Sequence, residues 1–319
     1  MKVLANDGLD KSGIIGLEKA GFNVDLTTVA QEQLLDYINK NKVTVLLVRS
    51  ATKVRKDIID NCPTLKIIGR GGVGMDNIDV EYAREKGITV INTPAASSHS
   101  VAELVFAHLF GMVRFLHESN RNMPLVGDSK FGDLKKSYGK GIELKGKTLG
   151  VLGFGRIGQA TAKVALGLGM KVVAFDPFIE TATLELEFFD HQTLFFTIKT
   201  ISKEEVLKQA DFISIHVPAQ KEYVISTKEF DMMKNSAFIV NAARGGVLDE
   251  VALVEAIESG KIAGAALDVF EKEPTPEIQL LMNPNLSLTP HIGAATAEAQ
   301  DRIGSELASQ IIEFFNPKK

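Results

Sequence analysis

The sequence contains a single cysteine, Cys62, among its 319 residues. One cysteine excludes an internal disulfide and is typical of a protein from a reducing compartment. Nothing in the sequence around Cys62 indicates an activated nucleophile, so we interpret it as a structural thiol. We therefore expect no chemistry from sulfur in this chain.

Long apolar runs are also missing, and no stretch approaches the length that spans a membrane. Asn6 and Asp7 interrupt the N-terminal segment too early for a signal peptide. The formal net charge is only −4, which argues against a nucleic-acid or membrane partner while leaving room for a local positive site. We expect a cytoplasmic protein with no nucleic-acid partner, no membrane partner and no metal site.

Short apolar segments alternate with amphipathic segments along the whole chain. Parallel sheets that are covered by helices on both faces have this pattern, because their strands are buried on both sides. The sequence therefore predicts an α/β fold. The expected strands lie in 43–50, 65–72, 88–94, 148–155, 171–177, 211–218, 237–246 and 262–270.

The length favours two domains. A long apolar helix is expected over 101–116, after a polar stretch, and a final helix over about 296–315. The most economical arrangement is an outer domain of residues 1–98 plus 291–319, with residues 99–290 inserted as a second domain. A cleft between two such domains is a usual place for a small ligand.

Gly153, Gly155 and Gly158 form a GxGxxG motif in "VLGFGRIGQA". The motif alone is weak evidence, but here it follows a predicted strand, opens a helix expected near Arg156, and precedes Asp176 at the end of the next strand. Glycines in this context let the backbone approach a pyrophosphate, and the acid takes ribose hydroxyls. Asp176 would repel a 2′-phosphate, so the sequence favours NAD over NADP.

Arg244, Glu273 and His291 each come just after a predicted strand of the second domain. Ligands of open α/β sheets bind beyond the carboxyl ends of the strands, so these side chains can converge on one site. An arginine that leaves a buried strand is costly unless an anion meets it. Taken alone, Arg244 could instead form a surface ion pair, Glu273 could lie on a solvated turn, and His291 could be a core histidine with its hydrogen bonds satisfied.

Six motifs of the chain match those of a known family: "VLGFGRIGQA", "NAARGGVLDE", "ALDVFEKEP", "TPHIGAAT", "VRSATKV" and "GRGGVGMDN". Through these motifs and their order, the chain resembles the D-isomer-specific 2-hydroxyacid dehydrogenases over nearly its whole length, and within them the phosphoglycerate dehydrogenases. The resemblance implies two doubly wound parallel-sheet domains, with a Rossmann NAD-binding domain inserted into a flavodoxin-like substrate-binding domain. It also implies a short form, for which we expect no feedback through a C-terminal regulatory domain.

The resemblance also assigns roles to residues. It implies that Arg244 binds the substrate carboxylate and polarises its carbonyl, that His291 is the acid and base, and that Glu273 holds the histidine. Histidine suits this role because its unperturbed pKa is about 6.5. The expected NAD-binding residues are Gly153, Gly155, Arg156, Ile157, Gly158, Asp176, Ala242, Asp268 (a nicotinamide carboxamide contact) and Gly293.

A second anion site is expected in the outer domain, where a strand leads into a helix that we place near Val54. Donors and cations at such a point can hold a phosphate, so the expected substrate is a small phosphorylated 2-hydroxy or 2-oxo acid, D-3-phosphoglycerate. A solvated basic loop competes as an interpretation, most of all for Lys53. The expected substrate-binding residues are Arg49, Ser50, Thr52, Lys53, Arg70 and the backbone of Gly71, Gly72, Val73 and Gly74.

Two segments depart from the family pattern. Residues 179–200 are longer and more aromatic than usual and the loop 219–223 is short, which leaves the adenosine contacts open. The segment 117–147 is a polar excursion that in this family wraps onto a partner subunit, so we expect a homodimer, although a solvated loop has the same composition. His99, His108 and His117 are expected to be structural or surface groups, and His216 to act through its backbone.

Other functions remain open from the sequence. A hydroxypyruvate or glyoxylate reductase of the same family is the runner-up. An NAD-responsive corepressor built on the same fold is a further alternative, because fold does not determine function. The complete set of Arg244, Glu273 and His291 argues for catalysis.

Overall fold

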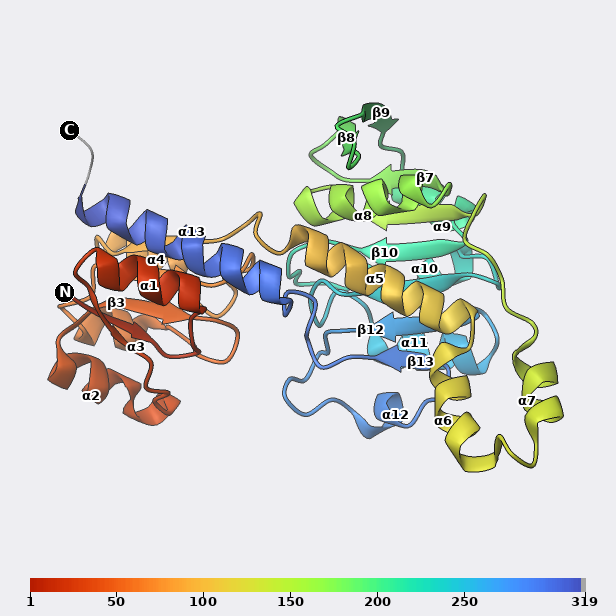
Figure 1. Cartoon of the computed structure of the whole chain (residues 1–319), viewed down its shortest axis with the longest axis horizontal. Helices are drawn as coiled ribbons and strands as arrows, with labels where there is room; N and C mark the ends of the chain where they lie inside the picture. The colour runs from red at the N-terminus through yellow and green to blue at the C-terminus, as the bar shows by residue number, and fades with distance from the viewer. Residues whose placement is uncertain (317–319) are drawn as a thin grey trace. The chain divides into compact units, whose positions relative to one another are not determined.

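A computed structural model describes residues 1–316 and divides the chain into two compact units. The first unit contains Met1–Ser100 and the segment that begins at Ala294, and the second is Val101–Gly293 (Figure 1). The sequence placed the second boundary three residues earlier. The structure keeps 291–293 in the second unit because Asp268 binds the backbone N–H groups of Ile292 and Gly293.

The first unit is built on a five-stranded parallel sheet with the order β2-β1-β3-β4-β5, which is the flavodoxin-like order. Val48 and Arg70 are paired in register, so the chain leaves β3 and β4 at the same edge of the sheet. The strands are β1 (Lys2–Ala5), β2 (Asn23–Asp25), β3 (Val43–Val48), β4 (Ile67–Arg70) and β5 (Thr89–Asn92), and the helices are α1 (Lys11–Lys19), α2 (Gln31–Asn41), α3 (Lys56–Asn61), α4 (Val80–Glu85) and α13 (Ala297–Phe315).

Helices α1 and α13 come from opposite ends of the chain and pack side by side on one face of this sheet (Figure 1). Glycines allow the close approach. A Cβ on Gly13 would lie 2.8 Å from the carbonyl oxygen of Gly304, and a Cβ on Gly304 would lie 2.9 Å from the nitrogen of Gly13. The final helix thereby becomes part of the core of the first unit, with Ile303 and Leu307 buried against the sheet.

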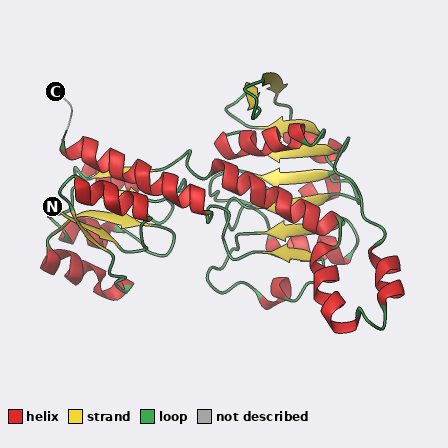
Figure 2. Ribbon diagram, viewed as in Figure 1, coloured by secondary structure: helices red, strands yellow, loops and turns green. Residues whose placement is uncertain are grey.

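The second unit contains a six-stranded parallel sheet with the order β13-β12-β11-β10-β6-β7. Helices cover both faces of this sheet (Figure 2). Neighbouring residues of one strand, such as Ile239 and Val240, belong to different core clusters, which explains why these strands are apolar throughout. The strands are β6 (Thr148–Leu152), β7 (Lys171–Phe175), β10 (Phe212–Ile215), β11 (Phe238–Asn241), β12 (Gly264–Leu267) and β13 (Leu286–Leu288), and the helices are α5 (Ser98–Val113), α8 (Arg156–Gly167), α9 (Lys203–Gln209), α10 (Thr227–Met232), α11 (Glu250–Glu258) and α12 (Ile278–Leu281).

The unusual segment after Asp176 forms an antiparallel hairpin of β8 (Thr181–Glu187) and β9 (Thr193–Lys199), beyond the β7 edge of the sheet (Figure 1). Its strands alternate: Leu184 is buried and pairs with Phe196, whereas Phe195 on the other face is 65% exposed. The sequence analysis noted the aromatic residues but did not predict the hairpin.

The segment 117–147, expected as a long loop, contains two helices, α6 (Leu116–Val126) and α7 (Phe131–Tyr138). Neither helix has a buried residue. Asn122 joins them by donating to the hydroxyl of Tyr138 at 2.8 Å. Within residues 1–316 no single helix is long and apolar enough to cross a membrane, and α5 and α6 pass that test only together, with a 55° bend between them.

The close contact between α1 and α13 can be tested with Gly304→Ala. The added Cβ must push the two helices apart, so we expect the variant to lose about 1–3 kcal/mol of unfolding free energy, as overpacked cores do. Gly111→Ala is the matched control, because Gly111 also lies within a helix and a Cβ there meets nothing within 4 Å. Denaturant unfolding would measure both, and equal stability of the two variants would contradict the packing.

Candidate active site

In the loop between β6 and α8, two glycines lie where the side chain of any other residue would clash. Gly153 has φ +90°, and a Cβ on it would lie 2.5 Å from the carbonyl oxygen of His216. A Cβ on Gly158 would collide with the carbonyl oxygen of Gly153. Gly155 differs, because a Cβ there would meet nothing within 4 Å. The loop thus packs tightly against the protein at Gly153 and Gly158. It leaves open space at Gly155, the residue that precedes the N-terminus of α8.

Asp176 follows β7 directly and lies beside this loop. One carboxylate oxygen accepts the N–H of Phe154 at 2.7 Å, and the other accepts the N–H groups of Phe178 at 2.9 Å and Ile179 at 3.1 Å. These bonds orient the carboxylate and leave Oδ2, which accepts only the N–H of Phe154, further capacity to accept a hydrogen bond. An open glycine loop beside an oriented carboxylate fits a dinucleotide whose ribose hydroxyls carry no phosphate.

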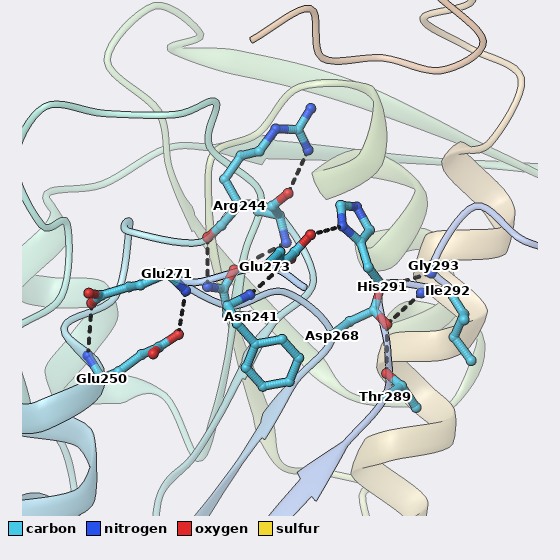
Figure 3. A network of polar contacts seen from close by, with 12 residues as sticks. Asn241, Arg244, Glu250, Asp268, Glu271, Glu273, Thr289, His291, Ile292 and Gly293 are labelled. Atoms are coloured by element: carbon cyan, nitrogen blue, oxygen red, sulfur yellow. Dashed lines mark hydrogen bonds and ion pairs between the residues drawn. The ribbon is translucent and has the colours of Figure 1, made fainter. Parts of the chain in front are cut away.

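Arg244, Glu273 and His291 follow the carboxyl ends of β11, β12 and β13, which are neighbours in the sheet. Nδ1 of His291 lies 2.9 Å from Oε2 of Glu273, and the two side chains are 34% and 35% exposed. The N–H of Phe270 donates to the other glutamate oxygen at 3.1 Å. Figure 3 shows Glu273 reaching towards the ring of His291, with Arg244 beside them.

The electrostatics of Glu273 are dominated by opposing effects. Burial raises the pKa of its carboxyl, but the hydrogen bond and charge of His291, the N–H of Phe270 and the charge of Arg244 together hold that pKa below its ordinary value. Glu273 is therefore ionised at neutral pH and can only accept. Nδ1 of His291 must carry the proton that joins them, which leaves Nε2 for a substrate.

The turn that carries Arg244 is held by Asn241, a residue that the sequence analysis did not single out. The amide of Asn241 donates to the carbonyl of Arg244 at 2.9 Å and accepts from the N–H of Ala243 at 3.1 Å. A Cβ on the next residue, Gly245, would collide with the carbonyl of Phe270. The turns after β11 and β12 are thus in contact, and no other residue type fits at Gly245.

Asp268 is 1% exposed and joins the ends of β12 and β13. Its carboxylate accepts the hydroxyl of Thr289 at 2.6 Å and the N–H groups of Ile292 and Gly293, both at 2.8 Å. His291, between these donors, has φ +55°. A non-glycine residue in this left-handed region costs about 1–3 kcal/mol and persists only where its surroundings hold it. The expected contact of Asp268 with a carboxamide stays a prediction.

The expected anion loop of the first unit is organised by Asp7. Its carboxylate accepts the N–H groups of Arg49 and Thr52, at 2.6 and 3.2 Å, and the hydroxyl of Thr52 at 2.6 Å. Thr52 is 4% exposed, and its oxygen also accepts from Asn6. The hydroxyl that we expected to contact the substrate is therefore engaged within the loop, while Ser50 and Lys53 are exposed.

Two further expectations for this loop are corrected. The helix expected near Val54 begins at Lys56, because Val54 forms a bridge with Ile78 instead. The backbone of Gly71 and Gly72 is also less available than expected. The N–H of Gly71 donates to Val48 and that of Gly72 donates to Arg70, so free donors in this segment would come from Val73 and Gly74.

Within the described residues, no group of three or more His, Cys, Asp or Glu side chains could hold a metal ion. Glu250 begins α11, and the pKa of its carboxyl is raised by burial and by the neighbouring glutamates Glu271, Glu277 and Glu273, despite the N–H of Glu271 that it accepts.

A sequence model of the "D-isomer specific 2-hydroxyacid dehydrogenase, NAD binding domain" matches residues 106–293. The chain belongs to this family. It is an NAD-dependent oxidoreductase of the D-2-hydroxyacid dehydrogenases, and the glycine loop with Asp176 lies within the matched NAD-binding domain.

Relatives of known name support the same family. The chain is 45% identical to a hydroxypyruvate reductase of Thermotoga maritima, over 98% of this chain and 97% of the relative. It is 43% identical to a D-3-phosphoglycerate dehydrogenase of Methanocaldococcus jannaschii, over 98% of this chain but only 57% of that enzyme. The substrate is therefore not decided by similarity.

Solved structures agree with the fold. The TT0316 protein of Thermus thermophilus has a TM-score of 0.81 at 30% identity, covering 100% of this chain and 98% of that one. An NAD-dependent formate dehydrogenase of Staphylococcus aureus, solved with NAD, has a TM-score of 0.80 at 26% identity, covering 100% and 97%. The fold expected from the sequence, two parallel-sheet α/β domains of Rossmann type, is confirmed.

Gly155 provides a test of the cofactor cradle. Gly155→Ala adds a methyl group where the protein itself has space, so we expect an unchanged melting temperature. The methyl would occupy the space that the pyrophosphate needs, and the dissociation constant for NADH should rise at least about tenfold, which corresponds to 1.4 kcal/mol. Fluorescence titration measures the affinity. Normal NADH affinity in a stable variant would contradict the assigned cradle.

Proposed function

We propose that this chain oxidises D-3-phosphoglycerate to 3-phosphohydroxypyruvate, and catalyses the reverse reduction, with NAD as the hydride acceptor. The observation that carries the chemistry is the 2.9 Å pair of His291 and ionised Glu273, at the strand ends beside Arg244. These groups supply a base, its partner and a cation within one unit. The reaction fits the family to which the chain belongs.

The proton is handled by His291. NAD, when bound, would supply the acceptor for the hydride of C2 of the hydroxy acid. Nε2 of neutral His291 would take the hydroxyl proton, so that the C–O bond becomes a carbonyl. The imidazolium that forms is stabilised by the carboxylate of Glu273 on Nδ1. In the reverse direction the same nitrogen returns the proton to the carbonyl oxygen.

Arg244 is proposed to bind the substrate carboxylate. A guanidinium can hold both carboxylate oxygens at once, which fixes the orientation of C2 in a way that lysine cannot. The rigid turn supports this role, because Asn241 and Gly245 fix the backbone on either side of Arg244. The positive charge of Arg244 helps to lower the pKa of Glu273, so the cation lies near the proposed acid–base pair.

The phosphate is proposed to bind at the loop that Asp7 organises in the first unit. Arg49 and Arg70 leave neighbouring strands at the same edge of the sheet, since Val48 and Arg70 are paired. The side chain of Arg49 passes beside Gly71, with its Cγ 3.7 Å from where a Cβ would be. With the exposed Ser50 and Lys53, the loop and this sheet edge carry three cations and a hydroxyl, the kinds of group that bind a phosphate dianion.

Hydroxypyruvate reduction is the second candidate. The Thermotoga relative with that name matches over 97% of its length at 45% identity, so the similarity is not confined to shared domains. The chemistry at His291 and Arg244 would be identical. The two candidates differ only in whether the basic loop of the first unit binds a phosphate.

We also propose a homodimer formed through 117–147. Helices α6 and α7 have no buried residue, yet Leu125 is 72% exposed and Phe131 is 60% exposed. Apolar side chains on otherwise uncovered helices are expected where a partner buries them. The family resemblance names the same segment.

The substrate can be decided by NADH oxidation with 3-phosphohydroxypyruvate and, in parallel, with hydroxypyruvate. The proposal predicts that wild type prefers the phosphorylated substrate and that Arg49→Ala loses that preference, by about tenfold to a hundredfold in kcat/KM if one charged hydrogen-bonded contact is removed. Turnover of hydroxypyruvate should change little.

The control is Arg55→Ala, which removes a nearby arginine that is paired with Asp79 at 2.8 Å. It should leave the substrate preference unchanged. If wild type favours hydroxypyruvate and Arg49→Ala changes nothing, then the phosphate site is wrong and the chain is a hydroxypyruvate reductase.

A further inference from the structure

His108 lies on α5 with a relative exposure of only 5%, among the apolar side chains of that helix. Its two ring nitrogens both meet hydroxyl groups from the end of β13. Nδ1 lies 2.8 Å from Oγ of Ser287, and Nε2 lies 3.0 Å from Oγ1 of Thr289. A buried histidine with two side-chain partners is held in one ring orientation.

The direction of each hydrogen bond that links His108, Thr289 and Asp268 follows from the protons that these groups can donate. Thr289 donates its single hydroxyl proton to the carboxylate of Asp268 at 2.6 Å. Its oxygen must then accept from His108, so Nε2 of His108 carries a proton. Burial lowers the pKa of His108, although the negative charge of Asp268 opposes this, so the ring is neutral. Nδ1 therefore accepts the hydroxyl of Ser287.

These linked hydrogen bonds end at the turn that carries His291. Asp268 accepts the N–H groups of Ile292 and Gly293, which follow His291 directly. His291 has φ +55° and donates its own N–H to the carbonyl of Thr289 at 3.1 Å. The position of the imidazole thus depends on where Thr289 and Asp268 are held.

We propose that His108 is a positioning residue for His291, acting through the hydroxyl of Thr289 and the carboxylate of Asp268. The inference rests on the proposed acid–base role of His291. By donating to Thr289, the ring directs the threonine hydroxyl onto Asp268 and fixes its rotamer. Asp268 then presents both oxygens to the 292–293 backbone, and the left-handed turn holds Nδ1 against Glu273.

A purely structural role predicts something different. On its own helix His108 lies beside the fully buried Val105 and Leu109, while its ring nitrogens face Ser287 and Thr289. If the ring only filled space, a leucine of similar volume should affect stability without a specific effect on the 289–295 turn. The two interpretations separate if loss of the ring impairs the turn and the chemistry more than it impairs stability.

The test uses His108→Leu, Thr289→Val, the double variant and Thr289→Ser in the full chain, with Val105→Ala as the control for a disturbed α5. Two properties are measured. Hydrogen exchange of the 289–295 segment without cofactor reports on the turn, and kcat with the KM for NAD reports on the chemistry. Melting temperature accompanies both.

We expect His108→Leu to lose protection in 289–295 and to lose kcat by about 10- to 100-fold, as misplacement of a catalytic group does. Thr289→Val should behave alike, and the double variant should be no worse than either alone, because all three break the same connection. Thr289→Ser keeps the hydroxyl and should restore most of the protection and of kcat.

Val105→Ala should lower the melting temperature while keeping kcat and protection. The proposal is overturned if His108→Leu keeps wild-type protection and kcat, or if the effects of His108→Leu and Thr289→Val simply add. If wild type itself transfers no hydride from any 2-hydroxy acid, the proposed function fails, and the exchange data still decide whether His108 holds the turn.

Discussion

The active-site geometry of the second unit depends on one buried carboxylate. Asp268 accepts a hydroxyl and two backbone N–H groups from the segment that follows β13, and so joins the ends of two strands. His291 lies within that segment in a left-handed conformation, which few residues adopt without support. Without this connection, nothing in the local sequence would keep the imidazole facing Glu273.

Close contacts between neighbouring turns complete the arrangement. Gly245 allows the turn after β11 to touch the carbonyl of Phe270 after β12, and Gly153 allows the turn after β6 to touch His216 after β10. The parallel sheet brings six strand ends to one edge, and these glycines let the loops pack there without clashes. The glycine loop and the turns that carry Arg244, Glu273 and His291 are thereby held by the same sheet.

Much of this could be predicted from the sequence, because the glycine motif and the residues just after apolar strands are local signals. The places of Arg244, Glu273 and His291 at neighbouring strand ends were predicted in this way, and their catalytic roles stay predictions. Contacts between residues that are far apart in the sequence could not be predicted from such local signals. Thr52 faces inward because Asp7, 45 residues earlier, accepts its hydroxyl, and His108 meets Thr289 across 181 residues. The β8–β9 hairpin was missed because its pairing depends on packing against the sheet edge.

The central claim is that His291, held by Glu273 and Asp268, transfers the proton. The most direct measurement is the pH dependence of single-turnover NAD reduction by the best 2-hydroxy acid, in wild type and His291→Asn. Oxidation needs a base that takes the hydroxyl proton, so the wild-type rate should fall as the pH is lowered. The variant should be about 10²- to 10⁴-fold slower and should not show that fall. A variant that keeps the wild-type rate and pH profile would contradict the account.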